Sequence, residues 1–436
     1  MVSPILPRRI GVNARSVPPV LHNQTFRRYW LSQIVSMTGT WMQQVAQSLV
    51  VLTLTTSALA VGAVGVVGSL PMLVLMLHAG VVADCYNRRI ILLATQAALG
   101  IFAVTFAALV YMDIVAYWQI IVLALLLGIT ASFELPASQS FIPELVGPDD
   151  LPQAIALNSA AFNGARLIGP ALAGVVIAVA GLAAAFVANA LSFLAVIGVL
   201  LTMRGYGDCR RSTPVRGAEA LREGLAYVRC RPHLLGLIGF AGATSLLVFP
   251  HITVLLPLYV TEVLGAGPGW VGGLLSCIGL GSLTGALAML KAGRSPRGVT
   301  RRLALSACGV TLGLLGLSLA RNPLLAVPAA AVLAFSVSLG MAQVSTRVQQ
   351  LAPDELRGRI TSIHALSFAG VTPFAVLLVS AQAEVVGLPT TLLVCAVGYA
   401  LCGVVLFLRF LRVRETRDDA VPAAQVPNLE IAKAGD

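Results

Sequence analysis

Charged side chains are scarce in this sequence. They make up 11% of the 436 residues, whereas hydrophobic residues make up 57%. A soluble domain carries about 25% charged residues, so the composition excludes an ordinary soluble protein. Lysine is almost absent, because only Lys291 and Lys433 are lysines among 29 basic residues. The long apolar runs that remain identify an integral membrane protein with many spans.

Several kinds of chemistry lack their motifs. The seven cysteines form no CxxC pair, which argues against a disulfide framework or a zinc site. No P-loop, GxSxG or HExxH motif occurs, so neither ATP hydrolysis nor a hydrolase is supported. The net charge of +11 lies in short loops between apolar segments, a pattern that does not favour nucleic acid. We therefore expect no enzymatic activity, no cofactor, no metal and no nucleic-acid partner.

Apolar windows long enough to cross a bilayer recur along the chain. A helix needs about 20 apolar residues to span the hydrocarbon. The sequence predicts an all-α membrane protein with twelve such helices, whose windows lie at 29–54, 58–82, 90–112, 115–136, 154–180, 182–203, 233–260, 268–291, 302–320, 323–346, 360–382 and 386–411.

The basic residues predict the orientation of these windows. With the N-terminus inside, every Lys and Arg except Arg166 and Arg321 falls in an inner segment, as the positive-inside rule requires. Both termini are therefore expected in the cytoplasm, and the protein in the inner cell membrane. No cleaved signal peptide is expected, because the first apolar window is too long for one.

The windows divide into two halves. We expect a cytoplasmic N-tail, a six-helix bundle, a linker with an amphipathic helix, a second six-helix bundle and a disordered tail, at 1–28, 29–203, 204–232, 233–411 and 412–436. A solvated charged linker is the alternative at 204–232. The motif PDDL at 148–151 recurs as PDEL at 353–356, before the fifth and eleventh windows. Parallel six-helix repeats are typical of one large transporter class with a midplane substrate site.

Residues 80–89, GVVADCYNRR, join the second and third windows. They resemble the loop signature of the major facilitator superfamily, which Gly80, Asp84, Arg88 and Arg89 match. Cys85 and Asn87 replace a basic residue and a glycine of that signature, and Asn tolerates the left-handed backbone that glycine would adopt. An aspartate at an inner helix end can meet the positive start of another helix, and the resemblance implies the eleventh helix. Alternatively, Arg88 and Arg89 only set the orientation.

The stretch NGARLIGPALAG at 163–174 resembles the superfamily's antiporter motif. Its small residues permit close helix packing, and the eighth window has a small row at Gly273, Cys277, Gly281 and Gly285. The resemblance implies that helices 5 and 8 meet between the halves. We therefore expect an interface motif formed by Gly169, Pro170, Gly174, Gly281 and Gly285.

Arg166 lies in the middle of the same window. A charge at this depth costs at least about 2.5–3.5 kcal/mol on insertion scales. It is either held by backbone carbonyls in a gate, or it contacts cargo or couples transport to protons. No Asp or Glu is expected deep in a span, which favours neutral or anionic cargo.

Polar residues form stripes on three windows that, in the superfamily, line the central cavity. The candidates for this cavity are Gln33, Thr40, Gln44, Gln47, Thr244, His251, Ser336 and Gln343. Hydrogen bonds between helices are the alternative for the first stripe. Coupling candidates are Arg166, His251 and Glu134, the last at the inner end of the fourth window. A neutral histidine bonded to a carbonyl is the alternative for His251.

Further stretches, at 26–47, 133–146 and 221–237, resemble the branch that contains the enterobactin exporter and the transmembrane secretion effectors. The resemblance implies a monomeric secondary transporter that exports an amphiphilic small molecule in exchange for protons. An importer or facilitator is the alternative within this class. A receptor or assembly partner on the same fold is the alternative from another class.

Overall fold

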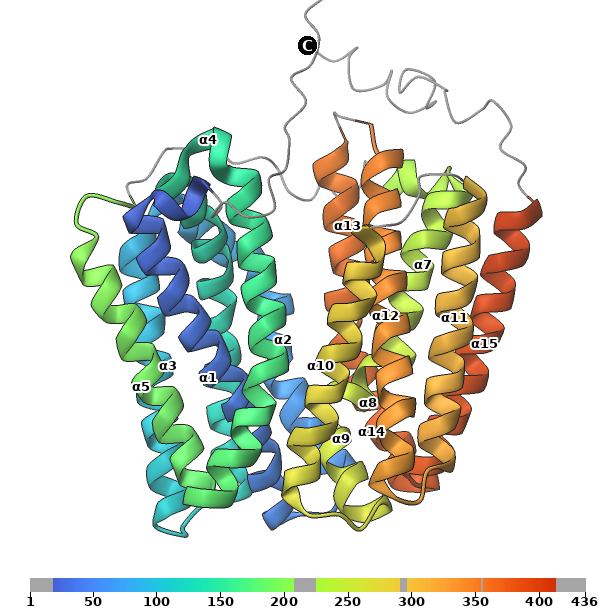
Figure 1. Cartoon of the computed structure of the whole chain (residues 1–436), viewed down its shortest axis with the longest axis horizontal. Coiled ribbons are helices and arrows are strands. Elements are labelled where there is room, and N and C mark those ends of the chain that lie inside the picture. The colour runs from blue at the N-terminus through green and yellow to red at the C-terminus, as the bar shows by residue number, and fades with distance from the viewer. Residues whose placement is uncertain (1–18, 208–224, 291–295, 354–355, 413–436) are drawn as a thin grey trace, which may run out of the picture.

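The protein consists of two helical bundles that lie side by side (Figure 1). The computed structural model describes residues 19–207, 225–290, 296–353 and 356–412. Within these ranges, helices dominate and there are no strands. The all-α fold predicted from the composition is thus confirmed.

The N-terminal bundle begins with a short 3-10 helix and contains five long helical elements. These are η1 (Pro19–His22), α1 (Gln24–Leu54), α2 (Ala58–Cys85), α3 (Arg88–Tyr111), α4 (Tyr117–Ala180) and α5 (Leu182–Thr202). Side-chain caps fix the starts of the first three long helices, since Asn23, Ser57 and Asn87 each accept a backbone N–H of the first turn.

The α4 element is two helices joined at Gly147. This residue has φ 74° and ψ 173°, whereas the flanking residues are helical. Glycine adopts positive φ without the steric cost that a Cβ imposes. The first half therefore rises to one end of the bundle and the second half returns from it (Figure 1), as predicted for the fourth and fifth windows.

The described part of the C-terminal bundle contains nine α-helices and a π helix. These are α7 (Pro232–Leu247), α8 (Phe249–Thr253), α9 (Leu256–Leu258), the π helix η2 (Tyr259–Val263), α10 (Pro268–Leu290), α11 (Pro296–Leu319), α12 (Pro323–Leu351), α13 (Arg357–Ala369), α14 (Thr372–Val386) and α15 (Leu388–Arg412). Most of the predicted amphipathic linker helix lies outside the described residues, although 225–229 are helical.

The structure tests the number of spans only in part. Nine segments among the described residues are long and apolar enough to cross a membrane, and one of them, 150–202, contains two predicted windows. The first predicted window lies in α1, which carries many polar side chains. The seventh is divided among α7, α8, α9 and η2, where Pro250 and Pro257 interrupt the hydrogen-bond ladder. Twelve spans therefore stay a prediction.

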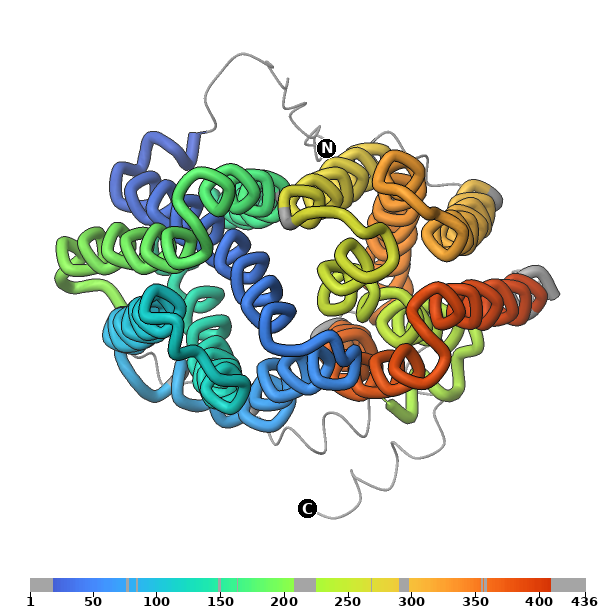
Figure 2. Tube along the Cα trace, turned by 90° about the horizontal axis from the view of Figure 1, so that it is seen from below, coloured from blue at the N-terminus to red at the C-terminus, as the bar shows by residue number. Residues whose placement is uncertain are grey.

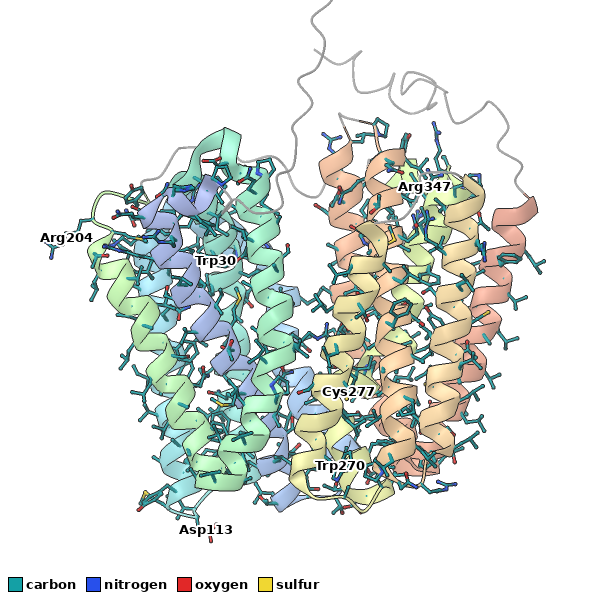
Figure 3. All side chains as sticks on the ribbon, in the orientation of Figure 1. Trp30, Asp113, Arg204, Trp270, Cys277 and Arg347 are labelled. Carbon is teal, nitrogen blue, oxygen red and sulfur yellow. The ribbon has the colours of Figure 1, made fainter. Side chains whose placement is uncertain are left out.

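We call the end at which α1 begins and α15 finishes the inner end, following the predicted orientation. Arg204 and Arg347 lie there, and Asp113 lies at the outer end (Figure 3). The bundles meet through α4 with α10 and through α2 with α14, as the view from the outer end shows (Figure 2). These helices approach at the outer end and diverge at the inner end (Figure 1). The structure is thus closed at its outer end.

Candidate functional site

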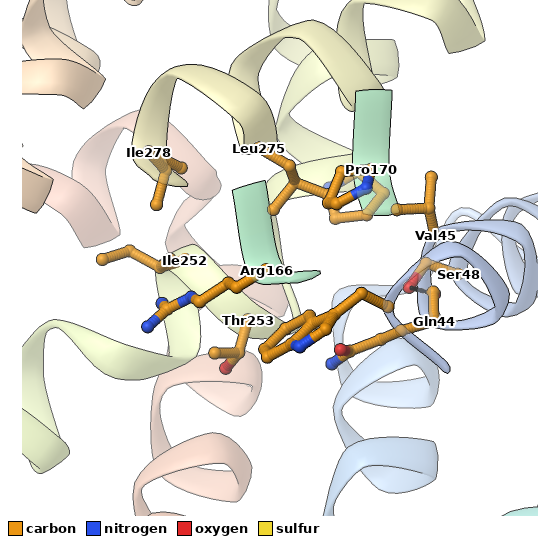
Figure 4. Close-up of a pocket in the computed structure, with 11 residues that line it drawn as sticks. Gln44, Val45, Ser48, Arg166, Pro170, Ile252, Thr253, Leu275 and Ile278 are labelled. Atoms are coloured by element: carbon orange, nitrogen blue, oxygen red, sulfur yellow. Dashed lines mark hydrogen bonds between the residues drawn. The ribbon is translucent and has the colours of Figure 1, made fainter. Parts of the chain in front are cut away.

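A small cavity lies between the two bundles, where they meet. Its wall combines α1 and the second half of α4 with α8, α9 and α10 (Figure 4). The lining residues are Trp41, Gln44, Val45, Ser48, Arg166, Pro170, Ile252, Thr253, Pro257, Leu275 and Ile278. The cavity holds about 30 Å³, which is enough for one or two water molecules. This volume is well below that of a pocket for a drug-sized molecule.

Arg166 supplies the positive charge of this cavity. Its guanidinium carbon lies 5.5 Å from the ring centroid of Trp41, within the range of a cation–π contact. We find no carboxylate paired with Arg166 in the described part of the chain. In Figure 4 the guanidinium points towards Ile252 and Thr253 of α8. An arginine that stacks on a ring and has no acidic partner can receive an anionic or polar group from a ligand.

The polar stripe of α1 divides between this cavity and the bundle interior. Gln44 is exposed and lines the cavity. Gln33 is buried, and its Nε2 donates to the Tyr29 hydroxyl at 2.8 Å. Thr40 is exposed and donates to the carbonyl of Ser36, whereas Gln47 is half-buried. The structure thus brings Gln44, but not Gln33, into contact with the space between the bundles.

The helix-1 stripe can be tested by thiol labelling. In a cysteine-free variant, Gln44→Cys should react with a polar thiol reagent, because this position faces the cavity. Ala46→Cys and Gln33→Cys should react far more slowly, since the native side chains are 0% and 4% exposed and neither lines the cavity. Equal reaction rates at all three positions would contradict the placement of the stripe.

Three of the candidates in the C-terminal half point into their own bundle. Thr244 is fully buried and its Oγ1 lies 3.0 Å from the Tyr399 hydroxyl. Gln343 is buried and accepts a 2.6 Å hydrogen bond from Nε of Arg302. Ser336 is buried, and its carbonyl accepts from the Ser306 hydroxyl. None of them lines the cavity of Figure 4.

His251 lies in α8, next to the cavity-lining Ile252. The side chain is 5% exposed, and its Nε2 finds no hydrogen-bond partner among the described residues. The alternative for His251 was a neutral histidine bonded to a backbone carbonyl. No such hydrogen bond is found at this nitrogen among the described residues. His251 thus has an unpaired polar atom, among the described residues, in a helix that forms part of the cavity wall.

The helix that contains Glu134 extends beyond the predicted window, which ends at 136. The span that contains Glu134 runs from Tyr117 to Gly147 and does not end near Pro136. The carboxylate Oε1 accepts a 2.7 Å hydrogen bond from Nε2 of Gln96, which α3 contributes. The absence of acidic residues deep in a span stays a prediction. Gln96 escaped the sequence analysis, although an amide within an apolar window was a usable signal.

The inner loop between α2 and α3 is held by its arginines. Arg88 pairs with Glu144 of α4, and Nε of Arg89 donates to the carbonyl of Leu200 at 2.6 Å. The second carboxylate oxygen of Glu144 accepts from the backbone N–H of Gly207 at 2.8 Å. These contacts connect three segments of the N-terminal bundle. Glu144 was not among the residues predicted from the sequence to hold this loop.

Asn87 has a different role from the predicted one. Its φ is −61°, so the left-handed turn expected here is wrong. Instead, its Oδ1 caps α3 by accepting the N–H of Ile90 at 3.1 Å. Gly80 has open space around its Cα, and the side chain of Asp84 lies outside the described residues. The predicted latch of Asp84 stays a prediction.

The interface glycines fall into two groups. Gly272 of α10 meets Pro170, since a Cβ at Gly272 would lie 2.6 Å from that carbonyl oxygen, and Gly279 similarly meets Leu167. Gly174 faces the carbonyl of Gly269. The predicted meeting of helices 5 and 8 is thus found, between the second half of α4 and α10.

Three of the five glycine and proline residues predicted at this interface do not lie in it, so the prediction was wrong for them. Gly281 and Gly285 pack against α12 at Ala331 and Phe335, inside the C-terminal bundle. Gly169 packs against α1, next to Trp41. The small residues of α10 occupy more than one face of the helix. The glycines predicted from the sequence, Gly281 and Gly285, lie on the face that meets α12.

The sequence matches a known family along almost its whole length. The family described as transmembrane secretion effector covers residues 15–435. The chain is 30% identical to the multidrug efflux pump Tap of Mycolicibacterium fortuitum over 379 residues, which are 82% of this chain and 88% of that protein. It is 26% identical to the staphyloferrin A transporter of Staphylococcus aureus, over 83% of this chain and 90% of the relative.

Solved structures share the fold. A bacterial homologue of the human lysosomal transporter Spinster, in an inward-facing and unoccupied conformation, aligns with a TM-score of 0.67 at 15% identity. The alignment covers 92% of this chain and 100% of that one. A bacterial homologue of the iron transporter ferroportin, in an inward-facing state, aligns with a TM-score of 0.66 at 15% identity, over 89% of this chain and 98% of that one. The chain therefore belongs to the transmembrane secretion effector family, and it is a multi-pass membrane transporter of the major facilitator superfamily.

Proposed function

We propose that this transporter exports an amphiphilic neutral or anionic small molecule in exchange for protons. It would work by alternating access, as a monomer with both termini in the cytoplasm. The observation that carries the proposal is Arg166, which stacks on Trp41 between the bundles without a carboxylate partner in the described residues. The export direction is supported by similarity to efflux pumps such as Tap and a macrolide efflux protein.

The lining of the cavity supports a neutral or anionic cargo. Glu134 is an acidic side chain within a candidate span. It bonds to Gln96 inside the N-terminal bundle and does not line the cavity between the bundles, where Arg166 is the charged side chain. Apolar residues from both bundles surround that charge. An amphiphile with a carboxylate or a neutral polar head matches this combination.

The test is transport into inside-out vesicles with an acidic lumen. The probes are a macrolide, staphyloferrin A, and synthetic amphiphiles that share one tail and carry a carboxylate, an amide or an ammonium head. We expect the carboxylate or amide probe to accumulate in the lumen, and accumulation to stop when a protonophore collapses the pH gradient. Accumulation of the ammonium probe alone would overturn the cargo class, and gradient-independent flux would overturn proton coupling.

Replacement of Glu134 should abolish proton coupling but leave the movement of cargo across the membrane intact. A buried carboxylate that bonds to a neutral amide can take up and release a proton without breaking an ion pair. Glu134→Gln should therefore exchange cargo down its gradient but fail to accumulate it against one. His251→Asn serves as the comparison. If His251→Asn loses accumulation and Glu134→Gln keeps it, the histidine carries the proton instead.

A further inference from the structure

An acidic residue connects the two bundles at the outer end. Glu384 lies in the last turn of α14 and is exposed. Its Oε2 accepts a hydrogen bond from the Ser57 hydroxyl at 2.9 Å and another from the backbone N–H of Leu59 at 3.1 Å. Both donors belong to the start of α2, in the other bundle. The contact therefore crosses between the bundles.

The chemistry of this contact is that of a helix cap supplied by another helix. The first N–H groups of α2 have no partner within the helix, and they concentrate partial positive charge there. Ser57 already caps α2 through the N–H of Ala60 at 3.2 Å. The carboxylate of Glu384 adds a full negative charge and a second acceptor at the same place, so it stabilises this start only while α14 stays against α2.

The same two helices pack closely just inside this contact. Ser380, one turn before Glu384, leaves no room for a side chain at Gly62 of α2. Val376, a further turn away, would lie 3.3 Å from a Cβ at Gly65. Ser380 is fully buried and its hydroxyl has no partner among the described residues. The two helices are thus tightly packed at Gly62 and Gly65, and Glu384 makes a polar contact at their outer end.

We propose that Glu384 is an outer gating residue, whose carboxylate holds α2 against α14 while the outer end is closed and releases it in each cycle. The inference rests on the alternating access of the proposed function. It also pairs with the predicted inner latch. In that latch, Asp84 at the end of α2 is predicted to meet the start of the eleventh helix. At the outer end, an acid at the end of that helix meets the start of α2. The two latches therefore join one pair of helices at opposite ends, each in a different state.

Charge removal at Glu384 tests this assignment. Spin labels at Val179→Cys and Leu319→Cys report the outer distance between bundles, and labels at Tyr86→Cys and Gln349→Cys report the inner one. All four native side chains are exposed. Glu384→Gln should increase the population with a long outer distance and a short inner distance. Glu384→Asp keeps the charge but shortens the side chain, so it should shift the same populations in the same direction.

Glu262→Gln is the matched control. Glu262 is an exposed acid at the outer end of the same bundle, and we find no hydrogen bond or ion pair for its side chain in the described part of the chain. It should leave both distances at their wild-type values. An equal shift in this control would mean that net charge, rather than the contact with α2, sets the populations, and the assignment would be wrong.

The Asp84→Asn variant distinguishes two outcomes: that Glu384 has no gating role, and that the protein does not work by alternating access. If Asp84→Asn changes the distances and Glu384→Gln does not, alternating access stands and the outer gating role is overturned. If neither variant changes any distance, with or without a pH gradient, both alternating access and the gate are overturned. Should Glu384→Gln be too unstable to purify, Glu384→Asp gives the same decision.

Discussion

Replacement of Arg166 by glutamine should remove most active transport while the protein still inserts and folds. Glutamine avoids the cost of a charge within the span, so amounts in the membrane should equal or exceed those of the wild type. We expect transport to fall roughly tenfold or more, since tenfold corresponds to about 1.4 kcal/mol and a desolvated cation–π contact is worth about 2 kcal/mol. Initial rates of probe accumulation in inside-out vesicles measure the effect.

Two further variants make this result specific. Arg166→Lys should restore part of the activity, because lysine keeps the charge but lacks the planar group that stacks on Trp41. Arg321→Gln removes the same kind of side chain from an exposed outer position and should transport normally. If Arg166→Gln fails to fold, the arginine is a structural tie; wild-type transport with normal proton dependence would exclude it from the mechanism.

A leucine at Gly272 should also stop transport. Even a Cβ there would lie 2.6 Å from the carbonyl oxygen of Pro170, in the other bundle. Gly272→Leu should therefore prevent closure of the outer end and trap the protein with its inner end closed. The expected result is normal insertion, a longer outer distance between spin labels, and transport reduced roughly tenfold or more, which is about 1.4 kcal/mol.

The neighbouring glycine provides the control. At Gly273 the nearest atom to an added Cβ belongs to Trp270 of the same helix, at 4.0 Å. Gly273→Leu carries the same side chain and the same change in helix propensity, but it leaves the interface open to closure. Its transport should stay near that of the wild type. Equal losses in the two variants would mean that leucine damages α10 itself rather than the contact between bundles.

The apolar windows predicted the helices well because burial in a bilayer leaves a long and simple pattern. Partners were harder to predict. The polar stripes of the seventh and tenth windows contain Thr244 and Gln343, which bond to Tyr399 and Arg302 within one bundle. A polar residue in a span shows that a partner is required, but its spacing does not reveal whether the partner is water or a neighbouring helix.

Two further differences have local causes. The fourth window was predicted to end at 136, but the helix continues to Gly147, where a positive φ ends it. The small residues of α10 include Gly272 and Gly279, which face α4, and Gly281 and Gly285, which face α12. Glycines on several faces of one helix permit several close contacts, and sequence alone does not assign each to a neighbour. Glu384 carried only a weak signal, as a single acid at the outer end of a span.

The broken helix opposite Arg166 bears on how many kinds of cargo the protein can accept. The N-terminal wall of the cavity is built from long, continuous helices, whereas its C-terminal wall includes α8 and α9, which have five and three residues and lead into a π turn. Short helices with prolines have fewer backbone hydrogen bonds to keep their pitch. One wall is therefore stiff and carries the charge, and the other is compliant. Such a transporter would bind the polar head of each cargo at the same place on the N-terminal wall. The C-terminal wall would adjust its shape to apolar tails of different width.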